Sequence, residues 1–153
     1  LGIICAIFPD ADVIGFQLGI SYSHFFGHRG FSHSLIFALL MAILIKLLFY
    51  RKLKLGSKSS FILIIYFFLC MASHGMLDAL TTGGLGIAFF SPFDNQRYFF
   101  PLRIIQVSPI GAKAFFSDAG IKVITSELKW IGLPCLCIII ISWIYSRSEK
   151  ELT

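Results

Sequence analysis

Two unbroken apolar runs constrain the fold of this chain more than any other feature. Residues 35–45 and 61–71 contain no charged side chain, and further apolar residues flank both runs. A helix of about 20 apolar residues is about 30 Å long, which matches the hydrocarbon thickness of a bilayer. Only 14% of the 153 residues are charged, against about 25% in soluble domains. The sequence therefore predicts an all-α, multi-spanning transmembrane helical bundle.

We predict about four membrane helices within a single domain, residues 1–153. Residues 1–8 form the remnant of the first helix, because the residue before Pro9 is disfavoured from helical geometry. The other three helices are predicted at 31–50, 60–80 and 130–146. Residues 87–127, which contain three of the five prolines, are predicted as a mixed loop and interfacial region on one face. Since the sequence begins at Leu1 inside an apolar segment, we expect a missing start before it.

The distribution of basic residues predicts the orientation in the membrane. Arg51, Lys52, Lys54 and Lys58 gather between the second and third predicted helices, as in a cytoplasmic loop under the positive-inside rule. Alternation of the helices then brings the polar motifs near residues 10, 30 and 75 to the extracytoplasmic face together. Because the net charge of +5 is explained by this pattern, we predict no nucleic-acid binding.

The acidic and imidazole side chains on that face predict a site for a divalent metal ion. His74 and Asp78 are four residues apart, so a helix places them on one face. An aspartate near the bilayer centre costs about 2.5–3.5 kcal/mol and usually marks a functional site. Imidazole and carboxylate together suit zinc, the ion we expect, with manganese or iron as alternatives. The predicted ligands are Asp10, Asp12, His28, His33, His74 and Asp78.

Each pair of these residues also has a simpler interpretation. His74 and Asp78 are equally consistent with a hydrogen-bonded pair that locks two helices. His28 and His33 fit interfacial histidines at a helix entrance. Aspartates that follow a proline usually belong to loops and helix caps. His24 lies among aromatic residues and is predicted to pack at the interface. What favours a metal site is that three such pairs meet on one face.

Four motifs together resemble a known family. They are PDAD at 9–12, HRGFSHS at 28–34, SHGMLDALTTGG at 73–84 and SPFDNQRY at 91–98. This combination, over roughly the first two thirds of the chain, resembles the LexA-regulated, YdjM-like family of membrane-bound metal-dependent hydrolases of bacterial inner membranes. The resemblance implies a multi-spanning helical fold, a divalent metal held by the six residues above and hydrolase activity. Remote similarity of the family to zinc-dependent phospholipase C enzymes favours a phosphoester substrate.

The chain departs from the family pattern at one point. Members begin with a Thr-His pair ahead of the PD motif, and no such pair follows Leu1. We therefore expect that one ligand lies in missing sequence or has been lost from this chain.

The leading functional prediction is metal-assisted hydrolysis of a phosphoester or lipid-like substrate at the membrane surface. Asp12 or Asp10 is predicted as the general base, and Arg29 and Arg97 as groups that steady an anion. Residues 89–100 are predicted to form an interfacial lid or a segment that lies on the membrane. The alternative is a non-catalytic membrane protein with a structural or sensory metal site. Membrane lipids are the expected partners, and no oligomeric state is predicted.

Overall fold

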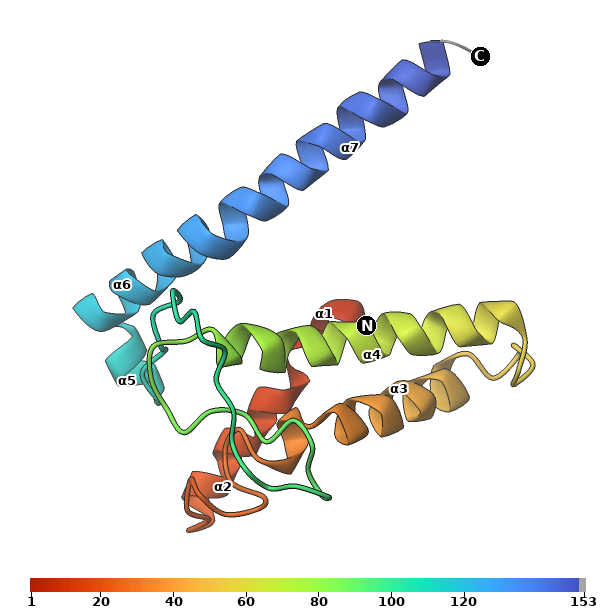
Figure 1. Ribbon diagram of the computed structural model, residues 1–153. Helices are drawn as coiled ribbons and strands as arrows, with labels where there is room; N and C mark the ends of the chain where they lie inside the picture. Colours follow the sequence, from red (N-terminus) through yellow and green to blue (C-terminus); the bar gives the residue numbers. More distant parts are fainter. Residues whose placement is uncertain (152–153) are drawn as a thin grey trace. The chain divides into compact units, whose positions relative to one another are not determined.

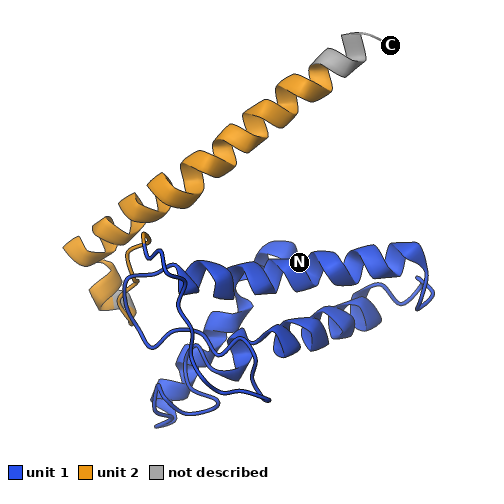
Figure 2. Cartoon of the chain, in the orientation of Figure 1, with its two compact units in different colours: residues 1–103 blue, residues 104–153 orange. Residues whose placement is uncertain are grey.

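The chain divides into two compact units, residues 1–103 and 104–153 (Figure 2). The computed structural model describes residues 1–151, without the side chains of residues 112 and 148–151. Where the sequence predicts a single domain, each unit has its own packing. Every regular element among the described residues is helical, which confirms the all-α class. One isolated antiparallel bridge joins Ile87 and Tyr98.

A pair of packed helices forms the centre of unit 1. Helices α3 (Leu35–Phe49) and α4 (Lys58–Ala79) run side by side in opposite directions (Figure 1). Each begins at a serine cap, because Ser34 Oγ accepts a hydrogen bond from the amide of Phe37 and Ser57 Oγ from that of Ser60. The small residues Ala38 and Ala42 of α3 face larger side chains of α4, so the two helix backbones pack closely.

The two helices differ in length. Helix α4 has 22 residues, or about 33 Å at 1.5 Å per residue, and is long and apolar enough to cross a membrane. Helix α3 has 15 residues and is shorter than the predicted 31–50. The reason is local, because η2 (Phe31–His33) is a 3-10 turn and Ser34 then caps α3 in an extended conformation.

The N-terminal segment stays helical beyond the predicted end at Pro9. Helix α1 (Gly2–Ile7) is followed directly by the 3-10 helix η1 (Phe8–Val13) and the short helix α2 (Ile14–Gln17). Pro9 occupies the first turn of η1, where its missing N–H interrupts no helical hydrogen bond. Helix α1 packs on α4, and η1 contacts α4 and η2. The PDAD motif therefore lies on a helical turn.

Unit 2 consists of a nearly continuous helical path. Helix α5 (Ala112–Phe115) precedes α6 (Asp118–Glu127), which passes through the π-helix η3 (Leu128–Gly132) into α7 (Leu133–Glu151). The helical path thus starts inside the region predicted as loop, 12 residues before the predicted boundary at 130. Residues 118–147 are long and apolar enough to span a membrane. With α4 and the shorter α3, this agrees with a multi-spanning helical protein.

Candidate metal centre

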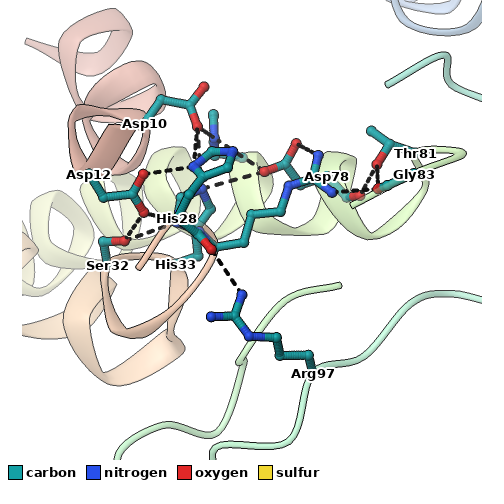
Figure 3. Close-up of polar contacts among 11 residues, drawn as sticks. Asp10, Asp12, His28, Ser32, His33, Asp78, Thr81, Gly83 and Arg97 are labelled. Carbon is teal, nitrogen blue, oxygen red and sulfur yellow. Dashed lines mark hydrogen bonds and ion pairs between the residues drawn. The ribbon is translucent and has the colours of Figure 1, made fainter. Parts of the chain in front are cut away.

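Three segments of unit 1 bring all six predicted ligands together. Asp10 and Asp12 come from η1, His28 from the turns before η2, His33 from η2, and His74 and Asp78 from the last turns of α4. Figure 3 shows the side chains of five of them, Asp10, Asp12, His28, His33 and Asp78, converging on one region beside α4. Since α3 starts just after His33 and α4 ends just after Asp78, this region lies at the end of the helix pair opposite the basic loop.

Four of the six residues point one atom each at a common point. Nε2 of His74 lies 3.2 Å from Asp10 Oδ1 and 3.6 Å from Asp78 Oδ2. Nε2 of His33 lies 3.4 Å from each of the same two oxygens. Three of these atoms are buried without any hydrogen-bond partner, namely His33 Nε2, His74 Nε2 and Asp78 Oδ2. We call these four side-chain atoms the nest. All four can donate an electron pair, so together they suit a cation.

The spacing of these atoms fits a tetrahedral zinc site. Ligand atoms about 2.0–2.1 Å from a tetrahedral centre are about 3.3 Å from one another. The four measured separations, 3.2–3.6 Å, bracket that value. Two imidazole nitrogens and two carboxylate oxygens are also a donor set that zinc, manganese and iron(II) accept. Both the geometry and the chemistry of Asp10, His33, His74 and Asp78 thus fit a divalent transition metal.

Asp12 lies behind His33, away from this nest. Its Oδ2 is 3.1 Å from His33 Nδ1 and accepts hydrogen bonds from the Arg29 amide and the Ser32 hydroxyl. Its Oδ1 is 2.7 Å from His28 Nδ1. With three hydrogen bonds and the contact to His33, Asp12 has the surroundings of a carboxylate that orients a ligating histidine. The roles of ligand and general base predicted for Asp12 stay predictions.

His28 is held on the outer side of Asp12. Its ring stacks on Tyr22, with ring centroids 5.3 Å apart, and contacts the edge of Phe16. Asp12, His28 and His33 also lie close enough to form a second group of three possible ligands. In this group, however, the ring nitrogens that face Asp12 already have partners, because His28 Nδ1 is hydrogen-bonded to Asp12 and His33 Nδ1 to the Ser32 hydroxyl.

Arg29 forms a buried ion pair with the nest. Its Nη2 donates to Asp78 Oδ1 at 2.9 Å, and its Nη1 donates to the carbonyl of Gly83 at 2.8 Å. The guanidinium is 4% exposed. This contact leaves Asp78 Oδ2 directed at the two histidines and offsets one negative charge. Arg29 has φ 63°, a conformation that costs a non-glycine residue about 1–2 kcal/mol, so the surrounding contacts hold it in place.

Arg97 binds backbone rather than the nest. Its guanidinium donates to the carbonyls of His28 and Tyr22 at 2.9 Å, and to that of His24 at 3.3 Å. These bonds fasten residues 91–98 to the turns that carry His28 and Arg29. The anion-binding role predicted for Arg29 and Arg97 therefore stays a prediction, since both guanidinium groups already have protein acceptors.

The surplus of carboxylates changes the protonation of the nest. Burial opposes ionisation of Asp10 and Asp12, but the close approach of the neighbouring histidines outweighs it and holds both pKa values well below the usual range. Burial also disfavours the imidazolium of His33, yet the close approach of Asp10, Asp12 and Asp78 prevails and raises its pKa to about 10. Without a metal, a proton on His33 supplies the positive charge that this site requires.

The nest is open on one side. The side chain of Asp10 is 51% exposed, whereas those of His74 and Asp78 are 17% and 18% exposed and that of His33 is fully buried. Catalytic metal sites keep a position open to water and substrate, whereas structural sites are closed. The half-exposed Asp10 therefore marks the side from which a small molecule can reach the centre.

Sequence reasoning missed several residues that support the site. Ser32 and the Arg29–Asp78 pair were not predicted as such, although Ser32 lies within the HRGFSHS motif. Gly75 lets α4 approach η2, because a Cβ there would lie 3.2 Å from the carbonyl oxygen of His33. The glycine between His74 and Met76 was a signal of close approach in the sequence.

The fold and the site define a helical membrane protein with an aspartate–histidine centre at one end of its helix pair. The model of the YdjM inner membrane protein family matches residues 1–150, and the chain belongs to that family. It is 37% identical over 142 residues to the inner membrane protein YbcI of Escherichia coli (strain K12), which covers 93% of this chain and 80% of that protein. No solved structure matches. This confirms the predicted family and a location in the inner membrane.

Proposed function

We propose that this protein is a membrane-bound, metal-dependent hydrolase that cleaves a phosphoester at the membrane surface. One observation carries the proposal: three buried ligand atoms without partners converge with a half-exposed carboxylate. An unsatisfied buried polar atom costs about 1–3 kcal/mol. A fold that keeps three of them together is best explained by a cation that binds them.

The proposed ligands are Asp10, His33, His74 and Asp78, with zinc as the first candidate and manganese or iron as alternatives. Calcium and magnesium are less suited, because they prefer shells made only of oxygen atoms. Asp12 and His28 are assigned a supporting role, since their contacts with His33 and with each other are complete.

A divalent ion in this centre would lower the pKa of a bound water and polarise a phosphoryl oxygen. The residues of the chain supply the rest. Asp12 holds His33 so that Nε2 keeps its lone pair toward the nest, and Arg29 directs one oxygen of Asp78 to the same point. Asp10, the half-exposed carboxylate, is the proposed ligand on the side from which a water would enter.

The centre is proposed to face the extracytoplasmic side. Arg51, Lys52 and Lys54 lie between α3 and α4, and Lys58 begins α4. Basic loops stay in the cytoplasm, and the centre lies at the other end of the two helices. Labelling of single cysteines introduced at residues 54 and 95 in intact cells tests this orientation, and outside labelling at 54 alone would reverse it.

The alternative is a non-catalytic protein whose metal serves structure or sensing. The same ligands would then bind the ion, but the open side at Asp10 would have no purpose. Turnover separates the two functions, because a structural site binds metal without hydrolysing any phosphoester.

The test uses purified protein in detergent. We expect about one divalent ion per chain by elemental analysis, together with hydrolysis of bis(p-nitrophenyl) phosphate. His74→Ala and Asp78→Ala should lose both. His24→Ala is the matched control, because His24 is exposed and its Nδ1 only accepts a bond from the Phe26 amide. Unchanged metal content in both site variants would disprove the centre, whereas bound metal without turnover would favour the structural alternative.

A further inference from the structure

The half-exposed ligand Asp10 is flanked along the N-terminal helical segment by exposed apolar side chains. Ile7 and Phe8 precede Asp10 and are 62% and 38% exposed, and Val13 and Ile14 follow it at 38% and 56%. In an inner membrane protein such side chains contact acyl chains, because this contact removes their apolar surface from water. The half-exposed ligand therefore lies where the hydrocarbon of the bilayer meets its polar surface.

Helix α4 presents a similar border. Leu77 follows His74 by three residues on α4, so it lies next to His74 on the helix surface, and its side chain is 37% exposed. Thus two of the segments that supply ligands, η1 and α4, also carry apolar groups next to those ligands. A substrate with an alkyl chain can bury that chain here while its polar group reaches the nest, at about 0.8 kcal/mol per CH₂ buried.

The charge of the centre favours a substrate with a single negative charge. Asp10, Asp12 and Asp78 contribute three negative charges, Arg29 contributes one positive charge, and a divalent ion contributes two. The sum is zero when the histidines are neutral. A substrate with two negative charges must lose more hydration to enter a partly buried site. A site with no net charge does not attract the second charge strongly enough to offset that cost. A phosphodiester, with one charge, therefore fits better than a phosphomonoester with two.

Arg29 is already counted in this sum, and Arg97 is left out of it because its guanidinium donates to backbone carbonyls rather than to the ligands. Both terminal nitrogens of each arginine donate to protein oxygens, namely Asp78 and Gly83 for Arg29 and three backbone carbonyls for Arg97. An anionic substrate would thus compete with these oxygens for the terminal nitrogens. Concentration of the substrate in the bilayer, rather than electrostatic attraction, is what would bring it to Asp10.

From these observations we infer that the substrate is a phosphodiester carried by a membrane-resident amphiphile, which reaches the centre along the apolar border beside Asp10. The inference rests on the proposed hydrolase function and specifies its substrate class. In the reaction, a water oxygen bonds to phosphorus, one P–O ester bond breaks, and a proton from the water passes to the leaving oxygen. The products are a phosphomonoester and an alcohol.

Three synthetic probes with the same leaving group test the inference. They are hexadecyl p-nitrophenyl phosphate, methyl p-nitrophenyl phosphate and p-nitrophenyl phosphate, each given to the metal-loaded protein in vesicles of phosphatidylethanolamine and phosphatidylglycerol. We expect kcat/KM to be at least about 100-fold higher for the hexadecyl diester than for the methyl diester, which corresponds to burial of only a few methylenes. The monoester should be the poorest of the three.

Two variants and one control locate the binding of the alkyl chain. Ile7→Gln and Ile14→Gln should each lower the preference for the hexadecyl over the methyl diester by about tenfold. Ile62→Gln is the matched control, because Ile62 is equally exposed, at 55%, but lies near the start of α4, away from the centre. Its preference should equal that of the unmodified protein.

The outcomes separate the two proposals. A methyl diester cleaved as well as the hexadecyl diester, or a monoester preferred over both, would overturn the substrate class and leave the hydrolase intact. If Ile62→Gln lowers the preference as much as Ile7→Gln, the border beside Asp10 is not the path of the chain. Bound metal with no turnover of any of the three probes would instead contradict the hydrolase function, and the inference about the substrate would then fail as well.

Discussion

Oδ2 of Asp12 lies 3.1 Å from Nδ1 of His33, while the other ring nitrogen of His33 lies 3.4 Å from both Asp10 and Asp78. The imidazole of His33 thus lies between Asp12 on one side and Asp10 and Asp78 on the other. The outer carboxylate favours the tautomer with a proton on Nδ1, and this leaves the lone pair of Nε2 for an ion. In the proposed metal centre, the affinity for an ion would therefore depend on a residue that does not touch it.

The first prediction concerns Asp12→Asn. An amide keeps the shape of the side chain but removes its charge, so His33 becomes a weaker and less well oriented ligand. We expect zinc affinity to fall about 10- to 100-fold, the usual effect of losing such a partner. Competition with a zinc-binding dye measures it. If turnover disappears while affinity stays unchanged, Asp12 is instead the general base that the sequence suggested.

The second prediction concerns the ion pair between Arg29 and Asp78. Arg29→Met leaves a mostly buried carboxylate without its partner, and we expect a loss of about 3 kcal/mol in the free energy of unfolding of the metal-free protein. Adding Asp78→Asn to it should restore part of that stability, since no unpaired charge remains. Thermal unfolding in detergent, followed by circular dichroism, measures both variants. Equal losses in the single and double variants would show that the pair does not act through charge.

The third prediction uses two glycines with similar backbone angles. Gly84 has φ +88°, and a Cβ there would lie 2.6 Å from Arg29 Nη1 and from Tyr22 Oη. Gly84→Ala should therefore displace Arg29 and lower metal affinity as well as stability. Gly56 has φ +90° with nothing within 4 Å of a Cβ. Gly56→Ala should show only the strain of about 1–2 kcal/mol, with unchanged metal affinity by dye competition. A similar affinity in the two variants would contradict the role assigned to Gly84.

The fourth prediction concerns the pH dependence of stability, which should have opposite directions without and with bound metal. The pKa of His33 is raised from 6.5 to about 10, so its contribution to stability is complete below pH 6.5 and is lost as the pH rises toward 10. The lowered pKa values of Asp10 and Asp12 make their contribution complete above about pH 4 and lost in acid. The metal-free protein should thus become less stable from pH 6.5 upward.

Zinc should reverse this trend, because a ligating His33 must lose its proton and the competition between proton and ion weakens as the pH rises. We expect the increase in melting temperature caused by zinc to grow between pH 5.5 and 8, while chelator-treated protein declines above pH 6.5. Melting curves with zinc and with chelator at each pH provide the comparison. A zinc effect that does not change with pH would exclude His33 as a ligand.

The helices and the members of the site follow from the sequence because their causes are local. Apolar runs of sufficient length predict α4 and most of α3, and the four-residue spacing of His74 and Asp78 places them on one face. All six predicted residues do come together in unit 1.

The division of roles within the site could not be predicted, because it depends on the path of the backbone. Asp10 and Asp12 are two residues apart, and only the 3-10 turn of η1 directs one into the nest and the other behind His33. The partner of Arg29 likewise depends on an unusual φ and on the approach of residues 83 and 84. The helix at 118–127 was missed because its residues are mixed rather than apolar.

The ligands come from segments that are far apart in the sequence, with Asp10 in η1, His33 in η2 and His74 in α4. A cation bound by all three is a cross-link that closes loops of the chain, much as a disulfide does. Its removal would free η1 from α4, whereas α1 would stay packed on α4. Chelation should therefore expose residues 8–13 to protease while α1 and the helix pair persist.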